Sequence, residues 1–281
     1  MFKVVSNELL APQVHRLVVV APRVAAARQP GQFVIVRLED GAERVPLTIA
    51  DADPAAGTIT LIIQAVGLST QRIVATPAGG FIRDVAGPLG RPTEIHNVGK
   101  VVCVGGGVGT AVLFPLAAAA AKAGNEVTTI IGGRSAPYVI LKDELAGFCK
   151  EVLVTTEDGS LGVKGFVTAV LKEIFEDASR RPCAVYAVGP VPMMSAVADL
   201  TREYAVRTIV SLNPIMVDGT GMCGGCRVTV GGVIKFACVD GPEFDGHAVD
   251  FRELSSRQNT YKEHQCRLDA QVSPRTPGGG K

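Results

Sequence analysis

The chain has 281 residues, of which 47% are hydrophobic and 20% are charged. This length allows two domains, or two domains and a small appendage, with a sizeable buried core. The 28 basic and 27 acidic residues leave a formal net charge of +1, which excludes the basic field of a nucleic-acid-binding protein. The longest nearly continuous apolar run, Ala111–Ala121, is shorter than the about 20 residues that span a bilayer. The composition therefore predicts a cytoplasmic protein with no membrane and no nucleic-acid partner.

The first region, residues 1–97, has the pattern of short β-strands. Turn residues such as Pro30-Gly31 and Asp40-Gly41 separate the strands. Five or six strands at this spacing predict a small antiparallel barrel. The runs that carry this prediction are Lys3–Val5, His15–Val20, Gln32–Leu38, Arg44–Ala50 and Thr58–Val66.

The second region, residues 98–212, alternates buried strands with helices. Val101–Val104 is apolar throughout, as in strands that are covered on both faces. A glycine-rich loop and an alanine-rich helix through Ala123 follow it. Further strands at Val127–Ile131, Val152–Thr155 and Ala184–Val188, with a helix around Val167–Phe175, predict a parallel α/β domain.

The glycine-rich loop of this region has the setting of a pyrophosphate site. It follows a buried strand and opens a helix, where backbone N–H groups and the helix dipole bind anions. A tight strand-to-helix turn without a ligand is the alternative. The absence of a Walker lysine argues against an ATPase. The residues concerned are Gly105, Gly106, Gly107, Gly109 and Thr110, and the threonine stands where the strict dinucleotide fingerprint has glycine.

Two further loops follow strands of the same domain. Arg134 comes after the second strand, where an arginine can accept the 2′-phosphate of NADP(H), or it is a solvated loop charge. Asp158-Gly159 comes after the third strand, at the edge where ligands bind, although an Asp-Gly pair is also an ordinary turn.

The third region, residues 213–251, is rich in glycine and cysteine. Cys223, Cys226 and Cys238 lie within 16 residues, and Asp218 stands where a C-x4-C-x2-C spacing would place a first cysteine. Glycines let such a loop fold around a cluster and point N–H groups at its sulfides. The spacing favours an iron–sulfur cluster. The alternatives are a zinc site completed by His247 and unligated thiols.

The last region, residues 252–281, predicts one charged helix over 252–268 and a disordered polar tail over the last dozen residues. The four other cysteines have no ligand spacing and are expected to be apolar or surface thiols: Cys103, Cys149, Cys183 and Cys266.

With its motifs in this order, the chain resembles the small (alpha) subunits of NADH-dependent ferredoxin:NADP oxidoreductases. It is similar to the beta subunits of sulfide dehydrogenases and, more distantly, to the electron-transfer subunits of dihydroorotate dehydrogenases. All belong to the ferredoxin reductase superfamily, and the resemblance covers about residues 1–268. It implies an FAD-binding β-barrel at 1–97, an NAD(P)-binding α/β domain with a parallel sheet at 98–212, and a 2Fe–2S module at 213–251.

The resemblance also implies roles for individual residues. Arg44–Ala50 resembles the family's flavin-binding stretch, and Gly87–Gly90 its GPLG turn. Asp218 and the three cysteines would ligate the cluster, as in the reductase small subunits. The other residues implied to bind cofactors are Pro46, Leu47 and Thr48 at the flavin, with the Thr48 hydroxyl at its ring, Arg44, Gly67, Ser69 and Thr70 at the FAD pyrophosphate, and Gly105–Thr110, Asp158, Gly159, Gly189 and Pro190 at the nucleotide.

The activity implied is electron transfer without a catalytic side chain, because the chemistry belongs to the cofactors. NADH would pass a hydride to FAD, and single electrons would leave through the 2Fe–2S cluster. The implied partner, in a heterodimer, is a larger flavin and 4Fe–4S subunit that handles NADP and ferredoxin. NADP(H) is the alternative nucleotide. Alternative functions are a sulfide dehydrogenase or dihydroorotate dehydrogenase electron-transfer subunit, a standalone flavin reductase, and a non-enzymatic metal or redox sensor.

Overall fold

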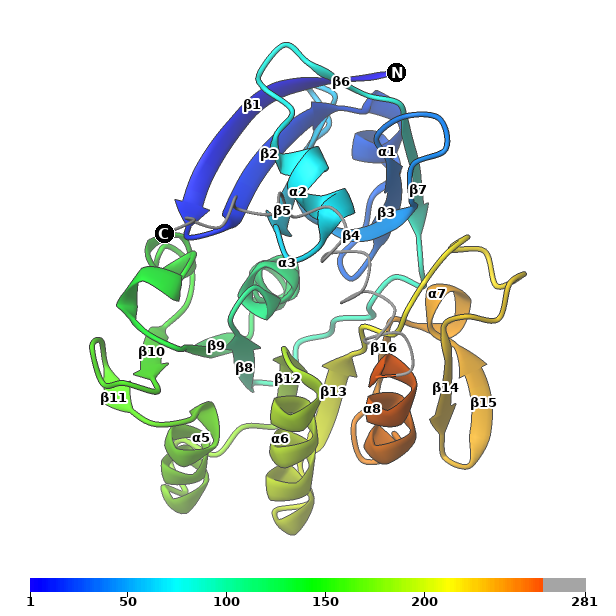
Figure 1. Cartoon of the computed structure of the whole chain (residues 1–281). Coiled ribbons are helices and arrows are strands. Elements are labelled where there is room, and N and C mark those ends of the chain that lie inside the picture. Colours follow the sequence, from blue (N-terminus) through cyan, green and yellow to red (C-terminus); the bar gives the residue numbers. More distant parts are fainter. Residues whose placement is uncertain (260–281) are drawn as a thin grey trace, which may run out of the picture.

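The structure is a computed structural model, and it describes residues 1–259. An antiparallel sheet lies above a parallel sheet, and a small C-terminal module stands beside the place where they meet (Figure 1). The predicted succession of an antiparallel region, a parallel α/β region and a small C-terminal module is confirmed.

The antiparallel sheet is curled and has the strand order β6-β1-β2-β5-β4-β3-β7. Its strands alternate between the core and the outer face, as in β5, where Ile59, Leu61 and Ile63 are buried. The sequence missed both edge strands, because β6 has only two residues and β7 contains Gly87 and Pro88. The elements are β1 (Phe2–Ala11), β2 (Val14–Val20), α1 (Pro22–Ala27), β3 (Phe33–Arg37), β4 (Val45–Asp53), β5 (Thr58–Gln64), α2 (Leu68–Val74), β6 (Phe81–Ile82) and β7 (Asp84–Leu89).

The second sheet has the order β11-β10-β9-β8-β12-β13-β16, and all its strands are parallel except β16 at the edge. Its elements are β8 (Lys100–Gly106), α3 (Gly109–Lys122), β9 (Glu126–Gly133), the 3-10 helix η1 (Ala136–Tyr138), α4 (Lys142–Ala146), β10 (Glu151–Thr156), β11 (Val163–Lys164), α5 (Val167–Glu176), β12 (Ala184–Val188), α6 (Val191–Glu203), β13 (Arg207–Ser211) and β16 (Glu243–Asp245).

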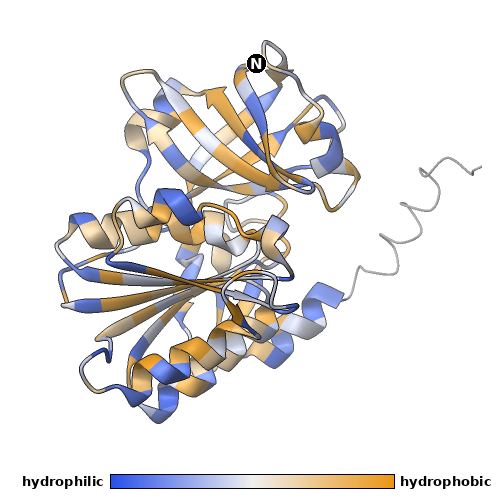
Figure 2. Cartoon of the chain, turned by 90° about the vertical axis from the view of Figure 1, so that its left-hand side faces the viewer, coloured by the Kyte–Doolittle hydropathy of each residue, from blue (hydrophilic) through white to orange (hydrophobic). Residues whose placement is uncertain are grey.

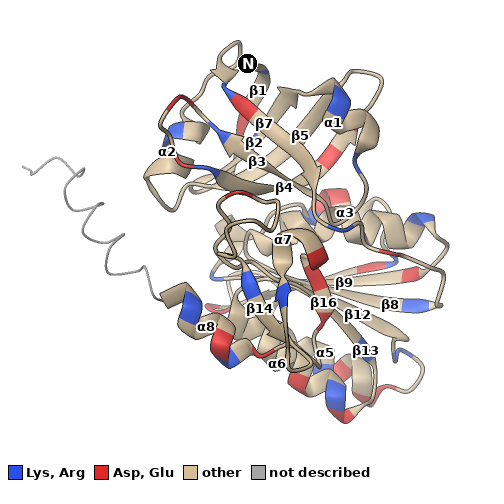
Figure 3. Ribbon diagram, turned by 90° about the vertical axis from the view of Figure 1, so that its right-hand side faces the viewer, with Lys and Arg blue, Asp and Glu red and all other residues tan. Residues whose placement is uncertain are grey.

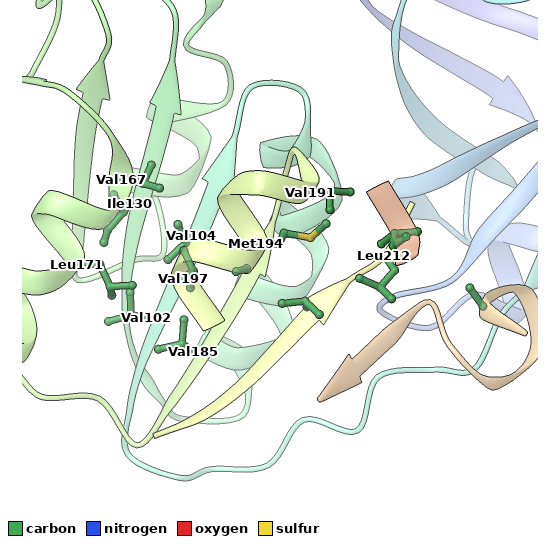
Figure 4. Packing of buried hydrophobic residues seen from close by; sticks show 14 of the residues in the cluster. Val102, Val104, Ile130, Val167, Leu171, Val185, Val191, Met194, Val197 and Leu212 are labelled. Atoms are coloured by element: carbon green, nitrogen blue, oxygen red, sulfur yellow. The ribbon is translucent and has the colours of Figure 1, made fainter. Parts of the chain in front are cut away.

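Helices cover this sheet on both faces, which explains its apolar strands. In β8, Val102 and Val104 belong to the core under α5 and α6, whereas Val101 and Cys103 belong to the core under α3. Figure 4 shows the first of these cores between the sheet and the two helices. The hydrophobic inner and hydrophilic outer faces of the helices are visible in Figure 2.

The C-terminal module contains a two-stranded hairpin and two helices. The elements are β14 (Arg227–Val230), β15 (Val233–Phe236), α7 (Ala237–Asp240) and α8 (Phe251–Asn259), and β16 joins the module to the parallel sheet. The helix expected over 252–268 begins at Phe251 and is described to Asn259. Its expected remainder and the polar tail lie outside the described residues. In residues 1–259, no helix is long and apolar enough to cross a membrane.

Candidate functional site

The glycine-rich loop lies between the end of β8 and the start of α3. Its glycines differ in what surrounds them. A Cβ on Gly109 would lie 2.5 Å from the carbonyl oxygen of Val188, and one on Gly106 would lie 2.5 Å from Met193 Sδ. Gly107 has φ +55 and faces open space, while its N–H donates to the Gly132 carbonyl over 2.8 Å. The loop is therefore tightly packed at Gly106 and Gly109 and open at Gly107, where an anion has room.

The loops after β9 and β10 come together at the same edge of the sheet. The Asp158 N–H donates to the Arg134 carbonyl over 3.3 Å. Ser160 donates its hydroxyl and its N–H to Asp158 Oδ1, over 2.6 and 2.9 Å, and these bonds lower the pKa of Asp158. Gly159 has φ +77, which suits its turn. Arg134 itself is exposed.

Gly189 and Pro190 lie next to the glycine-rich loop, at the start of α6. A Cβ on Gly189 would lie 3.2 Å from Gly106 Cα, and Pro190 is the residue that precedes the helix. The structure thus gathers the predicted nucleotide residues of four different loops, those after β8, β9, β10 and β12, at one end of the parallel sheet. Helix α3 also packs against β4 of the antiparallel sheet, which brings this edge next to the predicted flavin strand.

The predicted flavin residues lie on β4 and just before it. Thr48 pairs with Phe33, Leu47 with Val34 and Pro46 with Ile35 across β3. Pro46, Leu47 and Thr48 are half-buried, whereas Arg44 precedes the strand and is exposed.

The second group of predicted flavin residues, Gly67, Ser69 and Thr70, lies at the N-terminus of α2. The Thr70 hydroxyl accepts the N–H groups of Val66 and Gly67 over 3.1 Å each and donates to the Gly67 carbonyl. Thr70 therefore builds the turn. The Ser69 hydroxyl points elsewhere and donates to Glu43 Oε2.

The four candidate cluster ligands lie together as two pairs. Three of them are on the loop 218–226, here called the cysteine loop, and Cys238 is on α7. Cys223 Sγ lies 3.2 Å from Asp218 Oδ1, and Cys226 Sγ lies 3.2 Å from Cys238 Sγ. The first pair is accessible, whereas Cys226 and Cys238 are buried. Backbone N–H groups also point at sulfur, since Gly225 donates to Cys223 Sγ over 3.4 Å.

The electrostatics of the two pairs differ. Burial alone would raise the pKa of Asp218, but hydrogen bonds from Cys223 and Thr220 outweigh it and hold this pKa at about 2. Asp218 is thus a carboxylate at neutral pH. Burial, and then the neighbouring Cys226 thiol, raise the pKa of Cys238 to about 12. Two buried thiols side by side lose their protons readily only beside a cation, which a metal centre supplies.

Three thiols and a carboxylate are donors that both zinc and iron–sulfur clusters accept. Two close pairs suit a 2Fe–2S cluster, in which each iron takes two protein ligands. The residues present therefore fit the cluster.

The structure places His247 in a different environment. Its Nε2 lies 2.9 Å from the Thr201 hydroxyl on α6, and its carbonyl accepts a hydrogen bond from Arg202. These contacts tie His247 to α6.

The other cysteines in the described part of the chain are dispersed. Cys103 is buried in β8 and Cys149 is half-buried, and burial raises the pKa of both thiols. Cys183 is exposed. Cys266 lies outside the described residues.

The cysteine loop packs directly against the antiparallel sheet. A Cβ on Gly219 would lie 2.8 Å from Ile35 Cγ1 on β3 and 2.8 Å from Leu89 Cδ1 on β7. A Cβ on Gly90, just after β7, would lie 2.9 Å from Phe33 Cε1 and 3.1 Å from Pro242 Cδ. The loop of the candidate cluster ligands thus packs tightly against β3 and β7, and β3 pairs with the candidate flavin strand β4. The spacing of the motifs could not show this contact.

Comparisons with known proteins agree with this architecture. Residues 213–250 match the family model "iron-sulfur cluster binding domain of dihydroorotate dehydrogenase B". A dihydroorotate dehydrogenase B electron transfer subunit homolog of Thermotoga maritima is 46% identical over 94% of this chain and 92% of its own length. A probable subunit of this kind from Methanopyrus kandleri is 37% identical over 77% and 79%.

Solved structures show the same likeness. A chain of the NADH-dependent reduced ferredoxin-NADP oxidoreductase superposes with a TM-score of 0.91 and 45% identity, covering 96% of this chain and 97% of that chain. A cytochrome P450 reductase of Amycolatopsis, at 21% identity and a TM-score of 0.60 over 72% of this chain and 65% of its own, shares the fold alone.

The fold and the cysteine module define a ferredoxin-reductase-like electron-transfer oxidoreductase. The chain belongs to the family of dihydroorotate dehydrogenase B electron-transfer subunits, within which its resemblance to the NADH-dependent ferredoxin:NADP reductase subunit is also confirmed. The predicted cofactors, FAD, a 2Fe–2S cluster and NAD(H), agree with this membership.

Proposed function

We propose that this chain transfers electrons between NAD(H) and a larger partner subunit through FAD and a 2Fe–2S cluster. When bound, FAD accepts a hydride and releases its electrons one at a time, and the cluster carries single electrons. The observation that carries the proposal is the contact of the paired ligands with the flavin-side sheet, through Gly219, Ile35 and Leu89.

The residues of this chain have three tasks in this proposal. The open glycine loop at Gly107 and the loop at Asp158 bind the nucleotide at the edge of the parallel sheet. Thr48 and the turn before α2 bind the flavin from the antiparallel sheet. Asp218, Cys223, Cys226 and Cys238 ligate the cluster, two for each iron.

The surface over the cysteine loop supports a partner at this position. Val217, Met222 and Val239 are exposed by 51%, 89% and 50% around the candidate ligands. Apolar side chains grouped at an electron outlet favour a protein partner, because an interface excludes water and brings redox centres close. We propose a flavin and 4Fe–4S subunit that handles NADP and ferredoxin, in a heterodimer in the cytoplasm.

The carboxylate ligand distinguishes between the functions considered. Asp218 in place of a first cysteine resembles the ferredoxin:NADP reductase small subunit and departs from the dihydroorotate dehydrogenase branch. We therefore favour the first type of complex. We also propose that the domains of this chain end at residues 97, 212 and 251.

The replacement Asp218→Cys tests the ligand set. We expect the cluster to be retained, with shifted EPR g values and a shifted reduction potential, because a thiolate is a softer and more covalent ligand than a carboxylate. The control Asp245→Cys places a thiol on an exposed position of β16. An unchanged EPR spectrum in Asp218→Cys would show that the carboxylate is not a ligand, and protein without releasable FAD would refute the flavin assignment.

A further inference from the structure

Glu243 lies where the three parts of the molecule meet. It is the first residue of β16, and it pairs with Ser211 at the end of β13. The Leu212 N–H donates to the Pro242 carbonyl over 2.9 Å, which ties this segment to the parallel sheet. The Arg91 N–H donates to the Gly241 carbonyl over 2.6 Å, which ties it to the segment between the two sheets.

The carboxyl group of Glu243 faces the antiparallel sheet. Oε1 accepts a hydrogen bond from the Ser211 hydroxyl over 3.0 Å. A Cβ on Gly31 would lie 2.6 Å from Glu243 Oε2 and 2.1 Å from Thr93 Oγ1. The Thr93 N–H in turn donates to the Pro30 carbonyl over 3.0 Å. Oxygens from the module and from the connecting segment thus converge on the start of β3.

Both converging oxygens lack a hydrogen bond. Glu243 Oε2 and Thr93 Oγ1 are buried and have no partner with hydrogen-bond geometry among residues 1–259. Their proximity still lets the Thr93 hydroxyl favour a negative charge on the carboxyl group. A buried carboxylate with one unsatisfied oxygen is unfavourable, and the neutral acid is less so.

A polar cavity of about 300 Å³ lies beside this junction. Figure 3 shows acidic residues on α7 and β16 in this area. In the part of the chain that the structure describes, the Glu243 carboxyl group has no ion-pair partner, and the nearby Arg91 is 3.6 Å from Glu94. The titratable residues that line the cavity with it are Arg91, Glu94, Tyr186, Arg207, Asp240 and Asp245.

We propose that Glu243 is a positioning residue of the electron path, which holds the cysteine module against both sheets while its carboxyl group is protonated and loosens this junction when it ionises. The junction is a property of the chain itself. Its consequence for electron transfer rests on the proposed function, because the contact positions the candidate cluster ligands against the sheet that contains the candidate flavin strand.

The direction of the pH effect follows from the burial of the group. Burial raises the pKa of Glu243 from 4.5 to about 7, and the Thr93 and Ser211 hydroxyls lower it by less. A raised carboxyl pKa means that the folded state binds the proton more tightly than the unfolded state. The contribution of protonated Glu243 to the stability of the fold is therefore fully present below the unfolded-state pKa of 4.5, and it is lost as the pH rises through about 7.

The replacement Glu243→Gln tests this effect, because glutamine keeps the shape and stays neutral. Thermal unfolding of the full chain is measured between about pH 5 and pH 8. We expect wild type to lose several degrees of Tm relative to the variant over this range. The control Asp245→Asn, an exposed acid on the same strand, should keep the wild-type profile. Parallel profiles of wild type and Glu243→Gln would overturn the proposal.

Thr93→Val gives a second, independent measurement. It removes the hydroxyl that favours the carboxylate, so the protonation midpoint of Glu243 should move to higher pH. The infrared carbonyl stretch of the protonated acid, identified by its loss in Glu243→Gln, reports this midpoint directly. A midpoint that stays near 4.5, or that is unchanged by Thr93→Val, would contradict the proposed role.

The effect on electron transfer is measured last, in protein that holds its cofactors. We expect the rate of NADH-driven cluster reduction in wild type, relative to Glu243→Gln, to fall between about pH 6 and pH 8. A ratio independent of pH would overturn the role in the electron path. Protein without a cluster would instead refute the proposed function, and the unfolding profiles would still test the junction.

Discussion

The nucleotide sheet and the cysteine module are stabilised in different ways. All five residues of β12 are buried, and helices cover both faces of the sheet around it. In the module, β14 buries one residue of four and β15 buries none. Apolar contact therefore stabilises the sheet, whereas the module buries little of its own hairpin and relies on its contacts with the two sheets and, in the proposed function, on its bonds to the cluster.

The largest expected effect is that of Cys226→Ala on the module. Cys226 is buried and lies next to Cys238 Sγ, so its loss removes half of one ligand pair. We expect the absorption and EPR signals of the cluster to disappear, while FAD and NADH still bind and electron delivery to the partner stops. Cys183→Ala, at an exposed cysteine, is the matched control. A persistent cluster signal would show that Cys226 is not a ligand.

Leu171→Ala should destabilise the nucleotide domain and leave the cluster signals unchanged. Leu171 is a fully buried residue of α5, and truncating such a leucine costs about 2–5 kcal/mol through lost burial and a residual cavity. Urea denaturation measures this loss, and the EPR spectrum of the folded protein should not change. Val163→Ala, at an exposed position, should cost less than about 0.5 kcal/mol. Loss of the cluster in Leu171→Ala would break the distinction between the two regions.

Gly31→Ala probes the junction at Glu243, where the antiparallel sheet meets the segment that joins the module to the nucleotide sheet. Gly31 has φ +83 and faces Thr93 and Glu243, so we expect a loss of about 1–3 kcal/mol from strain and crowding. Gly41→Ala shares the strain, at φ +75, but meets nothing within 4 Å. The difference between the two variants in denaturation measures the crowding at the junction. Equal losses would mean that the junction accommodates a methyl group freely.

Arg134→Ala should have the smallest effect on stability, below about 0.5 kcal/mol, because its side chain is exposed. We expect NADH to be the preferred nucleotide, and the variant to lower only the use of NADPH, since an arginine–phosphate contact is charge-assisted. Steady-state kinetics with an artificial acceptor measure both. A wild-type kcat/KM higher for NADPH than for NADH would contradict this assignment.

Local patterns in the sequence were sufficient for most of the architecture. The strand expected at Ala184–Val188 has the observed bounds of β12, since a run of apolar residues needs burial on both faces. The hairpin partner β15 and the edge strand β16 were missed, because Glu243–Asp245 is short and polar and pairs only through its backbone.

The sequence by itself determined the class of fold, the succession of its parts and the residue types of the candidate sites, because periodicity, glycine loops and cysteine spacing are local. Tertiary structure decided the rest. It divided the four candidate ligands into two pairs, gave Thr70 a role in its own turn and placed His247 against Thr201. It also placed the Glu243 carboxyl group, with its buried Oε2 oxygen, among residues far apart in the chain, Gly31, Thr93 and Ser211. The environment of a buried carboxyl group is set by packing between distant segments, and no local pattern contains that information.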